Sequence, residues 1–233
     1  MQTLALSPPD LAAVLERDGH ALAPAVLDGA EVARLAESLP DPGSQAGTRS
    51  LLALATVRAV AADARLMSLA RLALGGGEVR AVRATLFDKT PAANWKVAWH
   101  QDLAIAVAGR ADVAGFGPWS VKDSIPHALA PTEVLERMVA LRLHLDDCGP
   151  ANGALRVVPG SHRLGRLDAA GAVAAAKASG NVACAAAAGD VLLMRPLLLH
   201  ASPPAEAPGH RRVLHLDYAA GGLPGGLRWH ADA

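Results

Sequence analysis

Residues 98–107, AWHQDLAIAV, place His100 and Asp102 two positions apart inside an apolar run. If this run is a β-strand, the two side chains project from one face while Gln101 points the other way. An imidazole and a carboxylate on one face are two of the three ligands of the 2-His-1-carboxylate arrangement, which binds Fe(II) and leaves other coordination positions open. A chance histidine in a core strand is the alternative, so the interpretation depends on a third ligand elsewhere.

The segment 189–218, GDVLLMRPLLLHASPPAEAPGHRRVLHLDY, supplies a candidate third ligand in His200, which ends an apolar run. Ser202 shares its face two residues later, and the turn-like stretch 203–210 leads into a strand that begins at Arg211. If these two strands pair as a hairpin, Arg211 returns roughly opposite Ser202. Its guanidinium, which can hold a carboxylate through two hydrogen bonds, then lies near the metal.

The composition favours a small-molecule partner. The chain has 233 residues and a formal net charge of zero, and it has no run of lysine or arginine, so we expect no nucleic acid as partner. No segment contains the roughly 20 uninterrupted apolar residues of a membrane helix, so we expect no membrane partner either. Cys148 and Cys184 are far apart and outside any CxxC pair, which indicates the reducing cytoplasm.

The pattern of periodicities predicts one domain over residues 1–233. Residues 1–77 have mostly helical signals, including Asp28 three residues before Glu31 in capping-box spacing. From residue 78 to about 220 short alternating segments with Gly/Pro turns predict strands, interrupted by a long irregular segment at 108–136 that we expect to be a lid loop. Helices followed by many strands indicate an α+β or mainly β chain built around a β-sandwich or jelly roll.

Several motifs together resemble those of the phytanoyl-CoA dioxygenase family of Fe(II)/2-oxoglutarate-dependent oxygenases. They are WHQD at 99–102, NGALRVVPGSHRLG at 152–165, GDVLLM at 189–194 and HASPP at 200–204, the last followed by Arg211. The N-terminal stretch 15–35 also resembles the opening segment of that family, so the likeness covers most of the chain.

The resemblance implies a double-stranded β-helix (a jelly-roll, cupin-like core) with the N-terminal helices packed on it. It assigns Fe(II) to His100, Asp102 and His200, and the distal carboxylate of the cosubstrate 2-oxoglutarate to Arg211 with Ser202. The reaction implied uses O2, releases succinate and CO2, and hydroxylates a small molecule. Asp102 favours hydroxylation over halogenation, because related halogenases have a small residue there; desaturation and ring closure stay open as alternatives.

Four further residues are candidates for contact with the substrate. Arg142 stands where relatives commonly have a tryptophan, and His144 and Asp146 share its face, which favours a polar or anionic substrate or else a buried ion pair without a catalytic part. His215 shares a strand face with Arg211, and Trp119 lies in the expected lid.

Two other functions remain as alternatives at this point. One is a cupin-like metalloenzyme that does not use 2-oxoglutarate, and the other is a non-catalytic ligand-binding or sensor relative that retains the pocket. The sequence leaves the primary substrate and the oligomeric state open.

Overall fold

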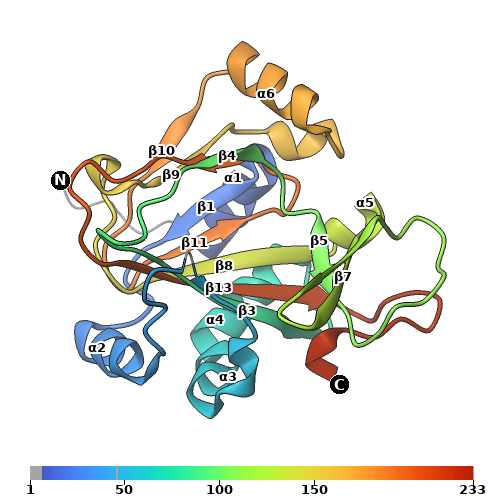
Figure 1. Ribbon diagram of the computed structural model, residues 1–233, viewed down its shortest axis with the longest axis horizontal. Coiled ribbons are helices and arrows are strands. Elements are labelled where there is room, and N and C mark those ends of the chain that lie inside the picture. Colours follow the sequence, from blue (N-terminus) through green and yellow to red (C-terminus); the bar gives the residue numbers. More distant parts are fainter. Residues whose placement is uncertain (1–6, 46, 233) are drawn as a thin grey trace.

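The computed structural model describes residues 7–45 and 47–232, and its centre is a six-stranded antiparallel sheet (Figure 1). The order of strands in this large sheet is β1 (His20–Ala23), β11 (Val191–Met194), β8 (Met138–His144), β13 (Arg211–Ala220), β3 (Val79–Lys89) and β2 (Gly47–Thr48). The long strands β3, β8 and β13 lie side by side in the middle, and every residue of β8 is buried.

A four-stranded sheet faces the large one. Its order is β10 (Val182–Cys184), β9 (Leu155–Val157), β12 (His200–Ser202) and β4 (Val97–His100). The chain passes repeatedly from one sheet to the other, as a jelly roll requires. The expected jelly-roll core is therefore confirmed.

Helices cover the outer faces of both sheets. Helices α2 (Gly29–Ser38), α3 (Ala55–Ala61) and α4 (Ala64–Ala73) lie below the large sheet in Figure 1, and α1 (Pro8–Asp18) packs beside β1 and α4. Helix α6 (Ala169–Ala178) covers the small sheet, where Ala172 and Ala176 meet Leu199. Shorter helical turns are η1 (Leu51–Ala53), α5 (Thr132–Leu135), η2 (Pro150–Asn152), η3 (Ser161–Leu164) and η4 (His230–Asp232).

Alternate residues of the central strands serve the two faces of the large sheet. On β13, Leu214 and Leu216 join the apolar core beneath the helices, whereas Arg211 and His215 point into the space between the sheets. The side-chain period of two in a strand explains this division. The interior between the sheets is polar beside β13 and apolar between β11 and β9, where Leu192 and Met194 meet Leu155 and Val157.

The N-terminal part is mostly helical, and the capping box predicted at Asp28 and Glu31 is present. This part also contributes β1 and β2, the two edge strands of the large sheet, which the boundary at residue 77 did not anticipate. β1 has four residues and β2 has two, so β1 is at the lower limit of length for an alternating pattern and β2 is below it. The first six residues of the predicted helical part lie outside the described residues.

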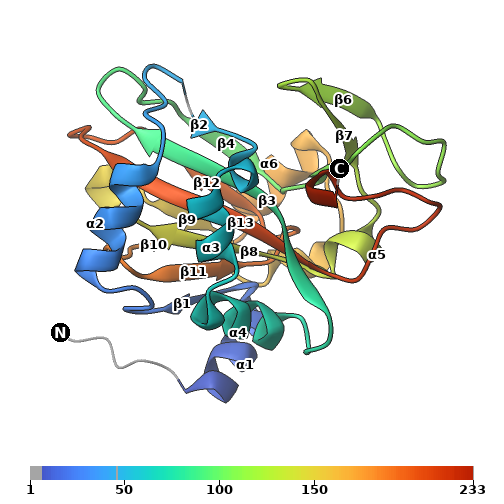
Figure 2. The ribbon, with the colours of Figure 1, turned by 90° about the horizontal axis from the view of Figure 1, so that it is seen from below.

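The segment 108–136 is not the irregular loop that the sequence predicted. It contains β6 (Trp119–Lys122) and β7 (Ile125–Leu129), which form a hairpin (Figure 2). With β5 (Ala104–Ala106) the hairpin makes a three-stranded sheet. The turn residues Asp123 and Ser124 have φ of 51° and 63°, values for which asparagine or glycine is the usual signal, so the hairpin was missed.

Candidate active site

The two histidines of the predicted site are direct partners across the small sheet. His100 ends β4 and His200 begins β12, and the two are in register, with ring centroids 4.1 Å apart. One ligand atom from each histidine and one carboxylate oxygen of Asp102 all lie within 4.8 Å of one another. The structure thus brings together the three residues that the sequence predicted as metal ligands.

Backbone hydrogen bonds orient both imidazoles. Nδ1 of His100 is 2.9 Å from the carbonyl oxygen of Ala98, and Nδ1 of His200 is 2.9 Å from that of Leu198. Because a carbonyl only accepts, each Nδ1 carries the proton and each Nε2 presents a lone pair. The Nε2 atoms are 3.8 Å and 3.7 Å from the oxygens of Asp102, so the donor set fits a divalent cation at one face.

Asp102 lies beyond the end of β4, not on the strand as predicted, and its position depends on two anchors. Its own N–H donates to the carbonyl of Pro196 at 2.9 Å. The preceding Gln101 is buried on the other side, where its amide donates to Gly165 and Leu197 and its carbonyl accepts from the N–H of Leu167. Gln101 therefore acts as a clamp on the segment between two candidate ligands.

The charges around Asp102 keep it ionised. Burial acts to raise its pKa, but the favourable electrostatic interactions of the carboxylate with His200, His215, His100 and Arg83 outweigh burial and hold the pKa well below its usual range. Burial also lowers the pKa of His200 to about 4, opposed by the charge of Asp102. At neutral pH an anionic carboxylate thus faces a neutral imidazole, the protonation states that metal binding requires.

Arg211 and Ser202 meet at one backbone carbonyl. Ser202 Oγ donates to the oxygen of Gly153 at 3.0 Å, and Nη1 of Arg211 donates to the same oxygen at 2.7 Å. The hairpin expected between their strands does not form, because β12 pairs with β4 and β9 while β13 pairs with β3 and β8. The segment 203–210 instead crosses from one sheet to the other, and it still brings the two residues together.

Lys89 lies beside this region, although nothing in the sequence around it distinguishes it from a solvated lysine. It is fully buried on β3, and its ammonium donates to the carbonyl of Pro203 and lies 5.5 Å from the ring of Trp95. Burial, together with the neighbouring charge of Arg211, lowers the pKa of Lys89 to about 8. The lysine thus supports the segment that carries the chain from Ser202 to Arg211.

Arg142 and His215 belong to a buried chain of polar side chains on the inner face of the large sheet. Arg142 donates to Nδ1 of His215 at 2.9 Å, His215 Nε2 lies 3.0 Å from Asp217, and Asp217 accepts from Arg83 at 2.5 Å. Burial and then the charge of Arg211 lower the pKa of Arg142 to about 10. Asp146 instead pairs with Arg212, so the ion pair considered for Arg142 and Asp146 is absent.

A cavity of about 430 Å³ lies over the candidate metal ligands. Besides the three ligands, the cavity is lined by Arg142, Ser202, Arg211 and His215 of the predicted residues. Its further lining residues include Arg49, Arg83, Thr85, Phe87, Trp95, Lys122 and His127. The unpredicted cationic residues stand on separate elements and form no motif in the sequence, so only the folded chain shows their convergence.

Two predicted substrate residues do not line this cavity. His144 is buried with both ring nitrogens unpaired, and burial and the charges of Arg142 and Arg211 lower its pKa to about 3. Trp119 packs on a separate apolar cluster, with the guanidinium of Arg110 5.6 Å from its ring centre.

A sequence model of the family described as phytanoyl-CoA dioxygenase (PhyH) matches residues 15–213. No curated protein matches the chain. Among the described residues, no helix has the length and apolar character needed to span a bilayer.

Solved structures share the fold over nearly the whole chain. AviO1 from Streptomyces viridochromogenes Tue57 has a TM-score of 0.69 and 24% identity, over 95% of this chain and 99% of AviO1. EctD from S. alaskensis, solved with 2-oxoglutarate and 5-hydroxyectoine, has a TM-score of 0.67 and 25% identity, over 94% of this chain and 78% of EctD. The epimerase SnoN, in complex with Fe3+, alpha ketoglutarate and nogalamycin RO, has a TM-score of 0.69 and 21% identity, over 94% of this chain and 91% of SnoN.

Proposed function

Because the chain belongs to the phytanoyl-CoA dioxygenase family and is an Fe(II)- and 2-oxoglutarate-dependent oxygenase, we propose that it hydroxylates a small organic molecule. The reaction consumes O2 and 2-oxoglutarate and releases succinate and CO2. The alternatives of a metalloenzyme without 2-oxoglutarate and of a non-catalytic sensor are not favoured.

In this proposal His100, Asp102 and His200 bind the iron, and Arg211 with Ser202 binds the distal carboxylate of 2-oxoglutarate. The observation that carries the proposal is the orientation of both Nε2 atoms toward Asp102 by backbone carbonyls. Bound iron and 2-oxoglutarate would supply the oxidising power for cleavage of a C–H bond.

The side chains of the protein hold and orient these groups. Arg211 is buried and needs a negatively charged partner, which a carboxylate entering the cavity provides through charge-assisted hydrogen bonds. Phe87 and Leu155 line the same cavity and limit the access of water to the reacting atoms. The protein thus positions the bound groups and partly excludes water from the reacting atoms.

Anaerobic calorimetry of the Fe(II)-loaded protein tests the assignment of Arg211. The Arg211→Ala variant should bind 2-oxoglutarate at least about tenfold more weakly, since a hydrogen bond to a charged group is worth roughly 1.5–3 kcal/mol. Arg212→Ala is the matched control, because Arg212 pairs with Asp146 on the opposite face of the strand and should leave the affinity unchanged. Equal affinities of Arg211→Ala and the wild type would overturn the proposed anchor.

Asp102→Ala tests the metal site in the same preparation. Turnover of 2-oxoglutarate with added Fe(II) should fall to background in this variant, together with metal affinity. Undiminished turnover would contradict the assignment of Asp102 as a ligand.

Hydroxylation is preferred to epimerisation because of what lines the cavity. Inversion of a stereocentre through a carbon radical needs a hydrogen atom delivered to its opposite face, and a tyrosine hydroxyl or a cysteine thiol is suited to donate one. Among the described residues that line the cavity there is neither, and the hydroxyl of Tyr218, the sole tyrosine of the chain, donates to Ala61 beneath the helices. Turnover under ¹⁸O2 should add one labelled oxygen to the product, whereas incorporation of deuterium from D2O without oxygen would indicate epimerisation.

The substrate is a small molecule, and Arg142, Arg83 and Arg49 in the cavity lining support a polar or anionic one. A substrate screen that measures stimulated formation of succinate, starting from metabolite extracts, tests this preference. We further propose a cytoplasmic location, which the unpaired thiols of Cys148 and Cys184 support.

A further inference from the structure

A second cavity adjoins the one over the metal ligands. It has a volume of about 310 Å³, and Arg49, Arg83 and His127 line both cavities. The rest of its wall is largely apolar and includes Leu52, Ala53, Val82, Ala84, Ala106 and Ile125. We call the shared region, together with Lys122 at its rim, the junction.

Three cationic side chains converge on the junction from three separate elements. Arg49 precedes η1, Arg83 lies on β3, and Lys122 ends β6 in the hairpin above the cavity. All three line the metal-site cavity, and the pKa of Lys122 is lowered by burial and then by the charges of Arg83 and Arg49.

Two of the three cations have carboxylate partners, and the third has none. Arg83 pairs with Asp217 at 2.5 Å, and Arg49 pairs with Asp123 at 3.1 Å. Lys122 makes no hydrogen bond or ion pair with any residue in the described ranges 7–45 and 47–232, although it lines the metal-site cavity. The junction therefore has one positive charge more than its own carboxylates balance.

His127 adds a further polar group to this region. It is buried on β7, and its Nδ1 is 2.9 Å from the carbonyl oxygen of Ile125, so that nitrogen carries the proton and Nε2 is left to accept. The remaining nearby carboxylate, Asp102, is a proposed iron ligand. Lys122 and Arg49 are exposed, so water solvates their charges in the free protein, and an anion that enters the cavity gains charged contacts with both.

We propose that the junction binds the anionic group of the primary substrate, a carboxylate or a phosphate, and that an apolar part of the same molecule occupies the second cavity. The C–H bond that is oxidised then lies in the metal-site cavity, next to the anionic group. This inference rests on the proposed function, because it treats the metal-site cavity as the place of oxidation. It specifies the substrate class as organic acids or phosphate esters with an apolar substituent.

Binding of a simple probe tests the junction without turnover. The probe is hexanoate, titrated anaerobically into the protein saturated with Fe(II) and 2-oxoglutarate, with hexanamide as its neutral counterpart and hexyl phosphate as the phosphate arm. Hexanoate or hexyl phosphate should bind at least about fivefold more tightly than hexanamide, since only the anions gain the charged contact. Whichever anion binds more tightly identifies the group that the substrate carries.

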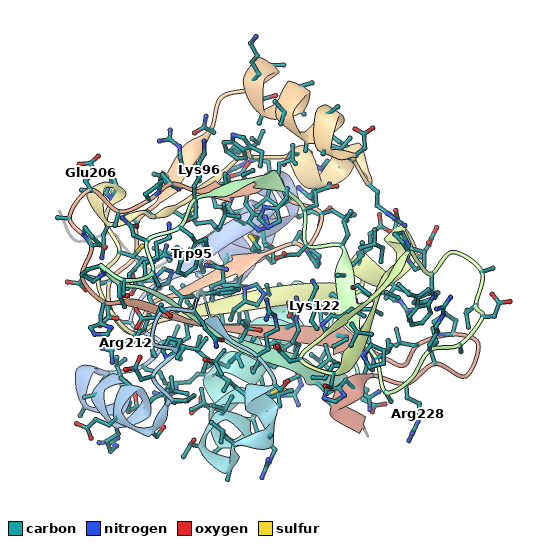
Figure 3. The ribbon with its side chains drawn as sticks, viewed as in Figure 1. Trp95, Lys96, Lys122, Glu206, Arg212 and Arg228 are labelled. Carbon is teal, nitrogen blue, oxygen red and sulfur yellow. The ribbon has the colours of Figure 1, made fainter. Side chains whose placement is uncertain are left out.

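Substitutions of Lys122 locate the binding. Lys122→Gln should weaken the binding of the anion about fivefold or more and leave hexanamide unaffected, and Lys122→Arg should restore most of the affinity. Lys96→Gln makes the same change of charge on an exposed residue that lies near the small sheet, away from Lys122 (Figure 3), and should have no effect.

Two results would overturn the inference. One is equal affinity for the anions and hexanamide, or for Lys122→Gln and the wild type. The other is displacement of 2-oxoglutarate by hexanoate, which would place the probe at Arg211. The proposed function fails separately, if 2-oxoglutarate itself does not bind the Fe(II)-loaded wild type.

Discussion

The guanidinium of Arg142 donates to Nδ1 of His215 at 2.9 Å, and this contact determines the tautomer of the histidine. Because a guanidinium only donates, Nδ1 accepts, and the proton resides on Nε2, which donates to Asp217 at 3.0 Å. Asp217 in turn pairs with Arg83. A single polar chain thus links Arg142, beside the proposed cosubstrate anchor, with Arg83 at the junction.

Replacing His215 should break this chain at its centre. His215→Leu leaves a buried donor of Arg142 and a buried acceptor of Asp217 without partners, and each is expected to cost about 1–3 kcal/mol of unfolding free energy. His215→Asn keeps an acceptor near the Nδ1 position and His215→Gln keeps a donor near the Nε2 position, so each should recover part of the loss. Urea unfolding measures the series, and a leucine variant as stable as the asparagine variant would contradict the network.

Gln101 should control metal affinity without touching the metal. Gln101→Leu preserves the volume of the side chain but removes three hydrogen bonds that fix the segment between His100 and Asp102. Loss of such supporting contacts typically lowers metal affinity about 10–100-fold. Competition with a chelator measures the change, and the exposed Gln45→Leu serves as control. An unchanged affinity for Gln101→Leu would show that Asp102 is held in place by other contacts.

Gly153 should tolerate no side chain. Its φ is +66°, and a Cβ would lie 2.8 Å from the carbonyl oxygen of Pro203. Gly153→Ala should therefore cost at least about 1 kcal/mol of stability and weaken 2-oxoglutarate binding, because the displaced carbonyl accepts from Ser202 and Arg211.

The matched control for that substitution is Gly149→Ala. Gly149 has a φ of −90°, and no atom lies within 4 Å of the position that a Cβ would occupy, so alanine should be neutral or slightly stabilising there. Thermal unfolding and calorimetry report the two effects, and equal behaviour of the two variants would count against the role of Gly153.

His144 should make the fold sensitive to acid. Burial lowers its pKa from the usual value near 6.5 to about 3, so the unfolded chain binds a proton that the folded protein excludes. Its contribution to stability is complete above pH 6.5 and is lost as the pH falls toward 3, at up to about 1.4 kcal/mol per pH unit. Between about pH 6 and pH 4 the wild type should lose more stability than His144→Leu. Parallel pH profiles for the two proteins would contradict this.

The sequence alone predicted those features that depend on residue types at a characteristic spacing. The jelly roll, the helices before it and the proximity of His100, Asp102, His200 and Arg211 could all be inferred, because each depends on a local pattern or on a motif. The pairing of β12 with β13 was wrong, since eight connecting residues can close a hairpin or cross between sheets, and spacing alone does not distinguish the two.

The sequence alone did not predict the role of residues that depends on their position in the folded chain. The neighbours of Lys89, Arg83 and Lys122 in the sequence form no recognisable motif. Strands far apart in the chain bury Lys89 and bring Arg83 and Lys122 to one cavity. The β6–β7 hairpin was missed for a different reason, because its turn, Asp123 and Ser124, lacks the glycine that usually marks a two-residue hairpin turn. The role of a side chain outside any sequence motif can be recognised only in the folded structure.

The alternation along β13 has a consequence for engineering. Leu214 and Leu216 pack against the helices, while Arg211 and His215 line the metal-site cavity. Adjacent residues of one strand therefore serve either stability or substrate binding. Inner-face positions of the same sheet, such as Thr85 and Phe87 on β3, can be randomised as a library with the helical packing left intact. Variants with new substrate preferences could then be selected, because the apolar residues that stabilise the fold lie on the opposite face of the same strands and stay unchanged.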